Sequence, residues 1–214
     1  MAINSISDFE GELRKSIEML FGSCEEYKGV LRSMPEHLGV SDTTVVFEAA
    51  FETGLNPDEL YPLLHFHTTL ARNIEDAKVP GVLKGLNELN TTISAGAFPS
   101  FGCFGYYEPL RQVYLSYRMP VNPADLEVEF ENARYYLGSL YEILDLFADF
   151  ILFICHDPSE MSLRAYMDYL DSITDLNDLK TRLDLMDKLV QEIEKNDVTE
   201  GENDQGEQPA IKEH

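Results

Sequence analysis

The longest regular pattern of apolar positions in the chain runs from Pro123 to His156. Apolar residues recur there at alternating steps of four and three, from Leu126 to Ile154. This spacing predicts a helix with one continuous apolar stripe, and at about 1.5 Å per residue the helix would be about 50 Å long. Beyond Ile143 the stripe widens, which predicts burial on more than one side. The residues that widen it are Leu146, Phe150 and Phe153.

Strict alternation of apolar and polar residues marks two segments in the first half of the chain. The odd positions are apolar in Thr44–Thr53, and the even positions are apolar in Leu60–Ala71. A period of two predicts strands with one buried face. Gly54–Asp58 contains an Asn-Pro pair and is predicted to be the turn between them. The residues predicted to face the core are Val45, Phe47, Ala49, Phe51, Leu64, Phe66 and Leu70.

Four polar residues that are able to bind a metal or transfer a proton are predicted on the opposite face of this strand pair. If core residues oppose core residues, Glu48 and Glu52 share the outer face with His65 and His67. Two imidazoles on one strand face, with a glutamate as third ligand, are a geometry that metal sites use. The other interpretation is that these side chains decorate an outer face or an interface. A histidine beside a glutamate is also able to act as a general acid or base. The sequence shows no accompanying nucleophile, oxyanion arrangement or cofactor loop.

A second strand pair is predicted at 101–107 and 113–119, joined by a turn that begins at Glu108. Within it, Gly102 and Gly105 are predicted to relieve crowding or to allow a bulge. A phosphate-cradling turn is the alternative, but the segment lacks the lysine and the helix start that such turns need. One face of the latter strand carries Val113, Leu115, Tyr117 and Met119. Its other face carries Gln112, Tyr114, Ser116 and Arg118.

Two shorter helices are predicted before the long one. A capping box at Ser7–Glu10 opens the first, which ends at Gly22, and Pro80 starts the second, which Gly96 closes. Residues 24–34 are open between a short strand and irregular chain. The first helix has the apolar face Ile6, Phe9, Leu13, Ile17 and Leu20. The second has the buried face Val82, Leu83, Leu86, Leu89 and Ile93.

Two asparagines, Asn87 and Asn90, are expected near the buried face of the second helix. A polar residue there usually caps a turn or bonds to neighbouring backbone, and a role in ligand binding is the alternative.

The last part of the chain predicts two more helices and a tail. A start signal at Asp157–Glu160 predicts a helix over Pro158–Leu170. Another begins at Asp175. The residues from Asp197 on have no periodicity and are rich in acids, so a disordered tail is expected. The helix from Asp175 has the stripe Leu176, Leu179, Leu183, Met186, Val190 and Ile193.

Composition restricts the classes of partner. The net charge is -23, from 39 acidic and 16 basic residues, which disfavours binding to nucleic acid or to an anionic membrane surface. The most apolar segment, Ile143–Ile154, is too short to span a membrane and contains Asp145 and Asp149. The beginning of the chain does not have the pattern of a signal peptide. The three cysteines lie far apart without metal-type spacing, so a reduced, cytosolic protein is expected, with Cys103 and Cys155 as core thiols.

The order of the predicted elements is helix, two or three strands, helix, two strands and long helix. With three short segments, this order resembles the YbjN-like family of small bacterial proteins, which has the type III secretion chaperone-like fold. The segments are Leu83-Lys84-Gly85-Leu86-Asn87-Glu88-Leu89-Asn90, Gly96-Ala97-Phe98 and Arg118-Met119-Pro120-Val121. The resemblance covers residues 4–156. It implies a protein that dimerises and binds other polypeptides without catalysis, and it brings no catalytic residues.

We therefore expect an α+β fold: a mainly antiparallel sheet covered by helices on one face, with additional C-terminal helices. The expected parts are a domain at 1–156, a helical extension at 157–196 and a disordered acidic tail at 197–214.

The expected function is a cytoplasmic, non-enzymatic protein-binding or chaperone-like module without cofactor. One alternative is a small metal-dependent enzyme using Glu48, His65 and His67, and another is a structural assembly protein. The residues expected at an interface are Glu48, Glu52, His65, His67, Tyr114 and Arg118.

A homodimer is expected because the long helix has more apolar stripe than a five-stranded sheet about 25 Å across needs, at about 4.8 Å per strand. An exposed apolar strip usually marks an interface. Salt should tighten the dimer because it screens the like charges. The dimer would use either the outer sheet face or the far end of the long helix.

Overall fold

The computed structural model describes residues 3–52, 61–97, 102–159 and 162–173. The chain divides into two compact units, Met1–Leu163 and Arg164–His214. In the second unit, residues 164–173 are helical. The start predicted at Pro158 is wrong, because residues 158 and 159 form a turn and the helix begins at residue 163. Three predicted segments lie outside the described residues: Gly54–Asp58, the helix from Asp175 and the tail after Asp197.

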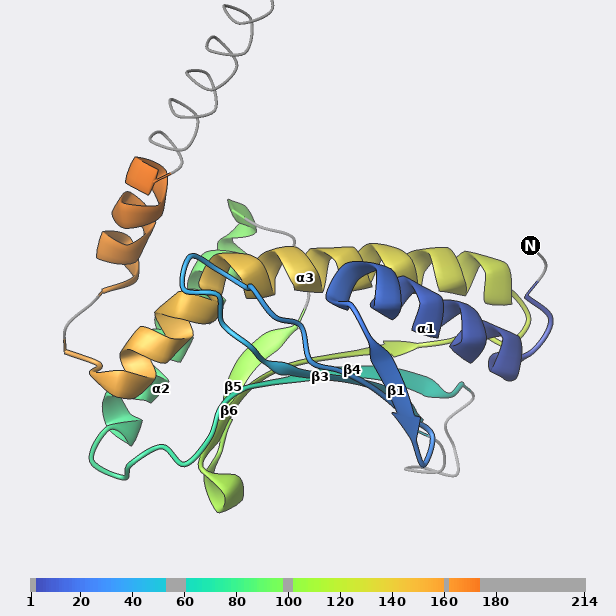
Figure 1. The fold of residues 1–214 in the computed structure, drawn as a ribbon, viewed down its shortest axis with the longest axis horizontal. Helices are drawn as coiled ribbons and strands as arrows, with labels where there is room; N and C mark the ends of the chain where they lie inside the picture. The colour runs from blue at the N-terminus through green and yellow to red at the C-terminus, as the bar shows by residue number, and fades with distance from the viewer. Residues whose placement is uncertain (1–2, 53–60, 98–101, 160–161, 174–214) are drawn as a thin grey trace, which may run out of the picture. The chain divides into compact units, whose positions relative to one another are not determined.

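A six-stranded antiparallel sheet is the central element of the first unit (Figure 1). Its spatial order is β1-β2-β3-β4-β6-β5. This confirms the predicted α+β class, with one strand more than the five expected. Residues 24–34, which the sequence left open, contain the β1–β2 hairpin. The strands are β1 (Cys24–Tyr27), β2 (Val30–Ser33), β3 (Val46–Glu52), β4 (Leu63–Ala71), β5 (Cys103–Tyr107) and β6 (Gln112–Pro120).

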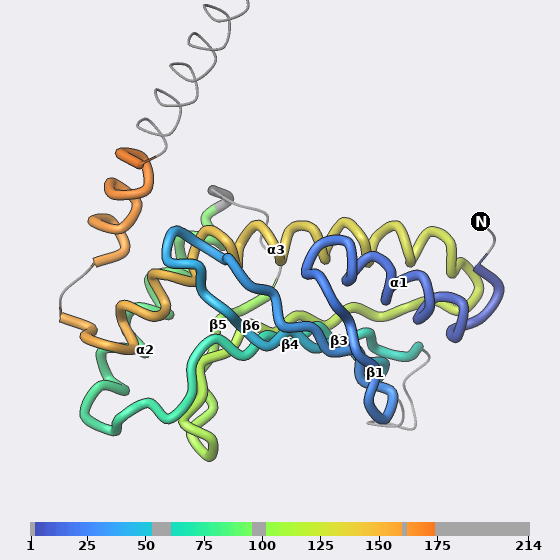
Figure 2. The backbone as a smooth tube through the Cα atoms, in the orientation of Figure 1, coloured from blue at the N-terminus to red at the C-terminus, as the bar shows by residue number. Residues whose placement is uncertain are grey.

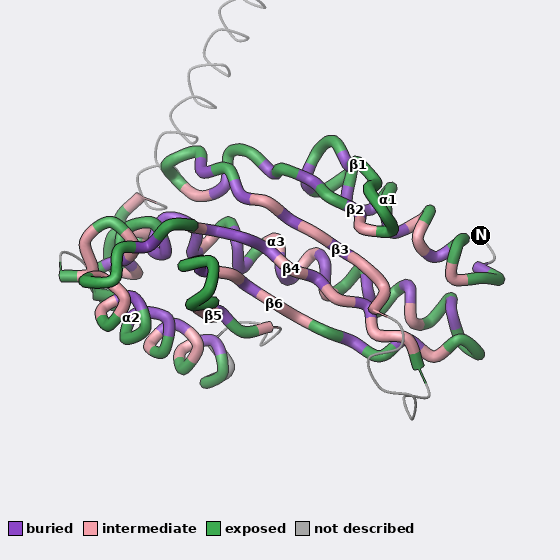
Figure 3. The backbone as a smooth tube through the Cα atoms, turned by 90° about the horizontal axis from the view of Figure 1, so that it is seen from below, coloured by how far each residue is buried: buried purple, intermediate pink, exposed green. Residues whose placement is uncertain are grey.

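Two helices, α1 (Ile6–Phe21) and α3 (Leu126–His156), lie on the same face of the sheet (Figure 1). The core lies between them and the inward side chains of the strands. Side chains that are at most 2% exposed include Phe47, Ala49, Leu64, Phe66 and Leu115. The opposite face of the sheet, which no described helix covers, is called the outer sheet face (Figure 3). It carries Arg32, Glu48, Glu52, His65, His67, Tyr114, Ser116 and Arg118.

α1 begins two residues earlier than its predicted capping box. Ser5 is the N-cap, and its hydroxyl accepts a hydrogen bond from the backbone N–H of Asp8 at 3.1 Å. The predicted end is correct, because Gly22 adopts a φ of +87° directly after the helix. Leu20 was predicted to be buried but is 37% exposed, and the neighbouring Phe21 packs in the core instead.

α3 begins three residues after Pro123 and ends at His156 as predicted. The stripe is buried along its whole length, because α1, the sheet and the segment between β2 and β3 all pack near this helix (Figure 2). At the widened end Phe150 is fully buried, but Phe153 is 38% exposed, so the prediction for Phe153 is wrong. The burial of the stripe also removes the exposed apolar strip from which a dimer interface on α3 was inferred.

α2 (Val79–Thr92) packs beside β5 and on α3, and a π-helical turn, η1 (Ile93–Ala97), continues it. The predicted closing residue Gly96 therefore lies inside that turn. Leu83, predicted to be buried, is 48% exposed. Asn87 is also exposed, whereas Asn90 bonds to backbone as expected, although to that of Phe104 on β5 and not to that of its own helix.

Close packing explains one glycine of β5. A Cβ at Gly105 would lie 2.6 Å from the ring of Tyr114, which confirms the prediction of crowding.

The cysteines predicted to be core thiols differ in burial. Cys103 is exposed, so its prediction as a core thiol is wrong. Cys155 is partly buried, and burial raises the pKa of its thiol to about 12.

Candidate functional site

The outer sheet face brings the predicted outer residues together on β3, β4 and β6. Glu48 pairs with His67, and His67 in turn pairs with Ser116 on β6. His65 pairs with Arg118 in the same way, two residues along the sheet. β3, β4 and β6 run side by side in Figure 3, which views this face. The parity argument from the sequence was therefore correct, and it holds because β3 and β4 pair in register over seven residue pairs.

His65 connects a carboxylate to a hydroxyl. Its Nδ1 lies 2.7 Å from Glu52 Oε1, and its Nε2 lies 2.8 Å from Ser116 Oγ. Because an ionised carboxylate only accepts hydrogen bonds, Nδ1 carries the proton and donates to Glu52. Nε2 is then the acceptor, and the Ser116 hydroxyl donates to it. Sequence reasoning placed Ser116 on this face but did not recognise it as a partner of His65.

Two ion pairs flank the histidines. Arg118 Nε lies 3.0 Å from Glu52 Oε2, and Arg32 Nε lies 2.9 Å from Glu48 Oε1. Burial raises the pKa of Glu52, but the hydrogen bond from Arg118 and the contact with His65 outweigh it, so the net pKa is lowered. Burial and then Arg118 lower the pKa of His65, although Glu52 and Glu48 oppose them. The result is a neutral imidazole between paired charges.

His67 belongs to a second hydrogen-bonded group. The Gln112 amide donates to Thr69 Oγ1 at 2.6 Å and contacts His67 Nε2 at 3.3 Å. Tyr114 stacks on the His67 ring with centroids 5.2 Å apart. Burial and the neighbouring His65 lower the pKa of His67. Thr69 and Gln112 are only 6% and 7% exposed, so the hydrogen bond between them is buried.

The chemistry of this face is restricted by how fully its groups are paired. Among the residues that the structure describes, no three His, Cys, Asp or Glu side chains are grouped so as to hold a metal ion. Of the predicted metal ligands, Glu48 is paired with Arg32, and both ring nitrogens of His65 already have partners.

The order carboxylate, imidazole, hydroxyl is the one that activates a serine nucleophile. Ser116, however, lies in the middle of β6 between β4 and β5. The backbone around it is engaged in the sheet. Acyl transfer benefits most from unpaired N–H donors aimed at the oxyanion. The outer sheet face therefore has the groups that activate a hydroxyl. In the described strands, no unpaired backbone N–H groups lie beside Ser116 to stabilise an oxyanion.

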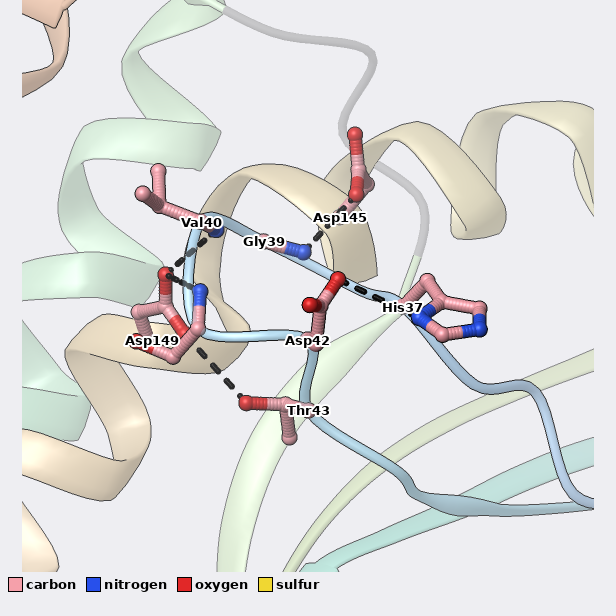
Figure 4. A network of polar contacts seen from close by, with 8 residues as sticks. His37, Gly39, Val40, Asp42, Thr43, Asp145 and Asp149 are labelled. Atoms are coloured by element: carbon pink, nitrogen blue, oxygen red, sulfur yellow. Dashed lines mark hydrogen bonds and ion pairs between the residues drawn. The ribbon is translucent and has the colours of Figure 1, made fainter.

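A second polar network attaches the segment between β2 and β3 to α3 (Figure 4). Asp149 Oδ2 accepts hydrogen bonds from the backbone N–H of Val40 at 2.7 Å and of Ser41 at 3.2 Å, and Asp149 Oδ1 accepts one from Thr43 Oγ1 at 3.2 Å. Asp145, one turn earlier, accepts from Gly39 N at 2.9 Å. The two carboxylates therefore supply the acceptors for one whole turn of the segment.

Asp149, the centre of this network, lies on the side of α3 that faces the core and is only 2% exposed. A Cβ at Gly39 would lie 2.7 Å from Asp149 Oδ2, and Gly39 has a φ of +70°, so glycine is required there. Sequence reasoning used Asp149 only as an argument against a membrane span. The signal in the sequence that could have identified this network was an acidic residue inside the most apolar stretch of the chain.

The comparisons with known proteins give no relative: no family model, no curated protein and no solved structure matches the chain. None of the helices in the described residues is long and apolar enough to cross a membrane.

Proposed function

We propose that this chain is a non-enzymatic, chaperone-like protein-binding module of the bacterial cytoplasm, and that it forms a homodimer through the outer sheet face. The observation that carries the proposal is the pairing of charge on that face. Arg32 is paired with Glu48 and Arg118 with Glu52, in a chain whose net charge is -23. Two such chains repel each other least where the charges are already neutralised.

The burial of the α3 stripe adds to this argument. Of the two surfaces predicted for a dimer, the far end of α3 lost its support, because Ile151 and Ile154 are buried within the chain. The outer sheet face keeps neutral, partly buried rings such as His67 and Tyr114. Flat stacked rings between paired charges offer contact area without an unpaired charge to desolvate.

The element order also supports the chaperone-like assignment. The described chain has α1, four strands, α2, two strands and α3. The YbjN-like resemblance implies the same order, with two or three strands where this chain has four.

Sedimentation equilibrium at low and moderate salt tests the homodimer. We expect a dimer at micromolar concentration that tightens as salt rises, because screening weakens the repulsion between like-charged chains. Arg32→Glu replaces the ion pair with two adjacent carboxylates, the new one and Glu48, and should weaken the dimer at least about tenfold, which corresponds to about 1.4 kcal/mol.

Arg134→Glu is the matched control. Arg134 is paired with Glu131 on α3, its side chain is 47% exposed against 52% for Arg32, and the substitution changes the net charge equally. It should leave the dimer nearly unchanged. A monomer in both salt conditions, or an equal effect of the two substitutions, would refute the proposed interface.

A second candidate function, in a different class, is a slow acyl hydrolase. The Glu52–His65–Ser116 chain of hydrogen bonds favours it. A fluorophosphonate probe would then attach to Ser116 in the native protein. His65→Gln should abolish labelling, and His67→Gln should leave it intact, because His67 contacts Gln112 and Tyr114 instead. Absence of the Ser116 adduct eliminates this candidate.

A further inference from the structure

The free edge of the sheet at β5 is partly satisfied by a side chain that imitates a neighbouring strand. Asn90 Nδ2 donates to the carbonyl oxygen of Phe104 at 2.8 Å, and the backbone N–H of Phe104 donates to Asn90 Oδ1 at 2.9 Å. One amide therefore makes both of the hydrogen bonds that a paired strand residue would make. Phe104 points its backbone groups away from β6 and toward α2.

The alternation of an antiparallel ladder extends this to Tyr106. Residues of β5 alternate between those that bond to β6 and those whose N–H and C=O point outward. Because Phe104 points outward, Tyr106 does so as well, since it lies two residues further along the same strand. β5 is the last strand of the sheet, so no described strand pairs with this side of Tyr106. An unpaired edge residue is a template for another extended chain.

A groove of about 580 Å³ lies at this edge, between the start of α2 and the end of β5. Its apolar walls are Val79, Pro80 and Leu83 from the helix side. Leu83 is 48% exposed, although it was predicted to be buried. Two acidic residues, Asp76 and Glu108, complete the lining together with Tyr106.

The acidic groups of the groove differ in their availability. Asp76 Oδ2 is already paired with Arg111 at 2.9 Å. No ion pair between described residues uses the Glu108 carboxylate. Glu108 therefore remains to attract a positive charge at the rim of the groove.

We propose that this groove binds an extended segment of another polypeptide, which pairs with the Tyr106 backbone, inserts an apolar side chain against Leu83 and places a lysine or arginine near Glu108. The backbone groups of Tyr106, with which no described strand pairs, call for a donor and an acceptor at strand spacing, and an extended main chain supplies both along its whole length. The apolar walls select the side chain, and the acidic rim selects the flanking charge. This surface is separate from the outer sheet face, so the proposal goes beyond the proposed function and does not depend on its dimer.

The probe is the synthetic peptide acetyl-Lys-Val-Leu-Val-Lys-amide, titrated into the isotopically labelled full chain and followed by amide chemical shifts. We expect saturable shifts confined to Phe104–Glu108 and to the first turns of α2. The same peptide with every backbone nitrogen methylated cannot donate to the Tyr106 carbonyl, and it should not bind. Equal binding of the methylated peptide, or shifts centred on the outer sheet face, would overturn the proposal.

Leu83→Ser and Leu110→Ser form a matched pair of variants. Both leucines are exposed, at 48% and 60%, so neither substitution opens the core, and only Leu83 lines the groove. Leu83→Ser should weaken peptide binding about tenfold, since one apolar contact of this size is worth about one decade of affinity. Leu110→Ser should leave the affinity for the peptide unchanged. Glu108→Gln should reduce the salt dependence of peptide binding. If Leu83→Ser changes dimerisation and not peptide binding, the groove holds a second copy of this chain and the proposal is wrong.

Discussion

The Asp149 carboxylate offers the sharpest test of how this fold is held together. Replacing Asp149 with alanine removes the acceptor for two backbone N–H groups and one hydroxyl at once. A hydrogen bond to a charged group contributes about 1.5–3 kcal/mol, and a buried donor left without a partner costs about 1–3 kcal/mol. The groups of Val40 and Ser41 lie in exposed residues, so water replaces part of what is lost.

We therefore expect Asp149→Ala to lower the free energy of unfolding by about 3 kcal/mol. Asp149→Asn keeps the shape. Its oxygen still accepts from Val40 and Ser41, and its NH₂ donates to the Thr43 hydroxyl, so only the charge is lost and about 1–2 kcal/mol is expected. Asp145→Ala removes a single, exposed bond to Gly39 and should cost less than about 1 kcal/mol.

Urea denaturation followed by far-UV circular dichroism gives the three free energies. Hydrogen exchange at Val40 and Ser41 reports whether the loss is local, because these amides should exchange faster in Asp149→Ala than in Asp145→Ala. If Asp149→Ala is no more destabilising than Asp145→Ala, the buried network does not hold the segment to α3 and the reasoning fails.

Two further predictions concern titration and thiol reactivity. Burial lowers the pKa of His65 and His67 below the ordinary 6.5, so their contribution to stability is complete above pH 6.5 and is lost as pH falls through the lowered values. The urea concentration at the midpoint of unfolding should decrease as the pH is lowered from about 7 to about 5. The decrease should be smaller in the chain that carries both His65→Gln and His67→Gln. An equal decrease in the two chains would contradict this prediction. A thiol-disulfide reagent should modify one thiol per native chain, which Cys103→Ser removes, because Cys103 is exposed while Cys24 is buried and burial raises the pKa of Cys155 to about 12. Fast reaction of a second thiol in the native state would show that Cys24 or Cys155 is not protected by burial.

The elements and their faces could be read from the sequence, because they depend on local periodicity. A period of two assigned the faces of β3 and β4, and steps of three and four assigned the buried side of α3. The gathering of His65, His67, Glu48 and Glu52 followed from parity alone, since the inward residues of two paired strands must oppose each other. These predictions required no knowledge of what lies elsewhere in the chain.

Only the tertiary structure decided which groups meet across long separations and which apolar residues are covered. The bond between His65 and Ser116 joins positions 51 residues apart, and Asp149 meets Val40 across 109 residues. Periodicity carries no information about such distances. The exposure of Leu83 and Cys103 was also unpredictable, because a residue on an apolar stripe is buried only where another element packs against it. At the edge of β5 that packing ends, and the groove begins there.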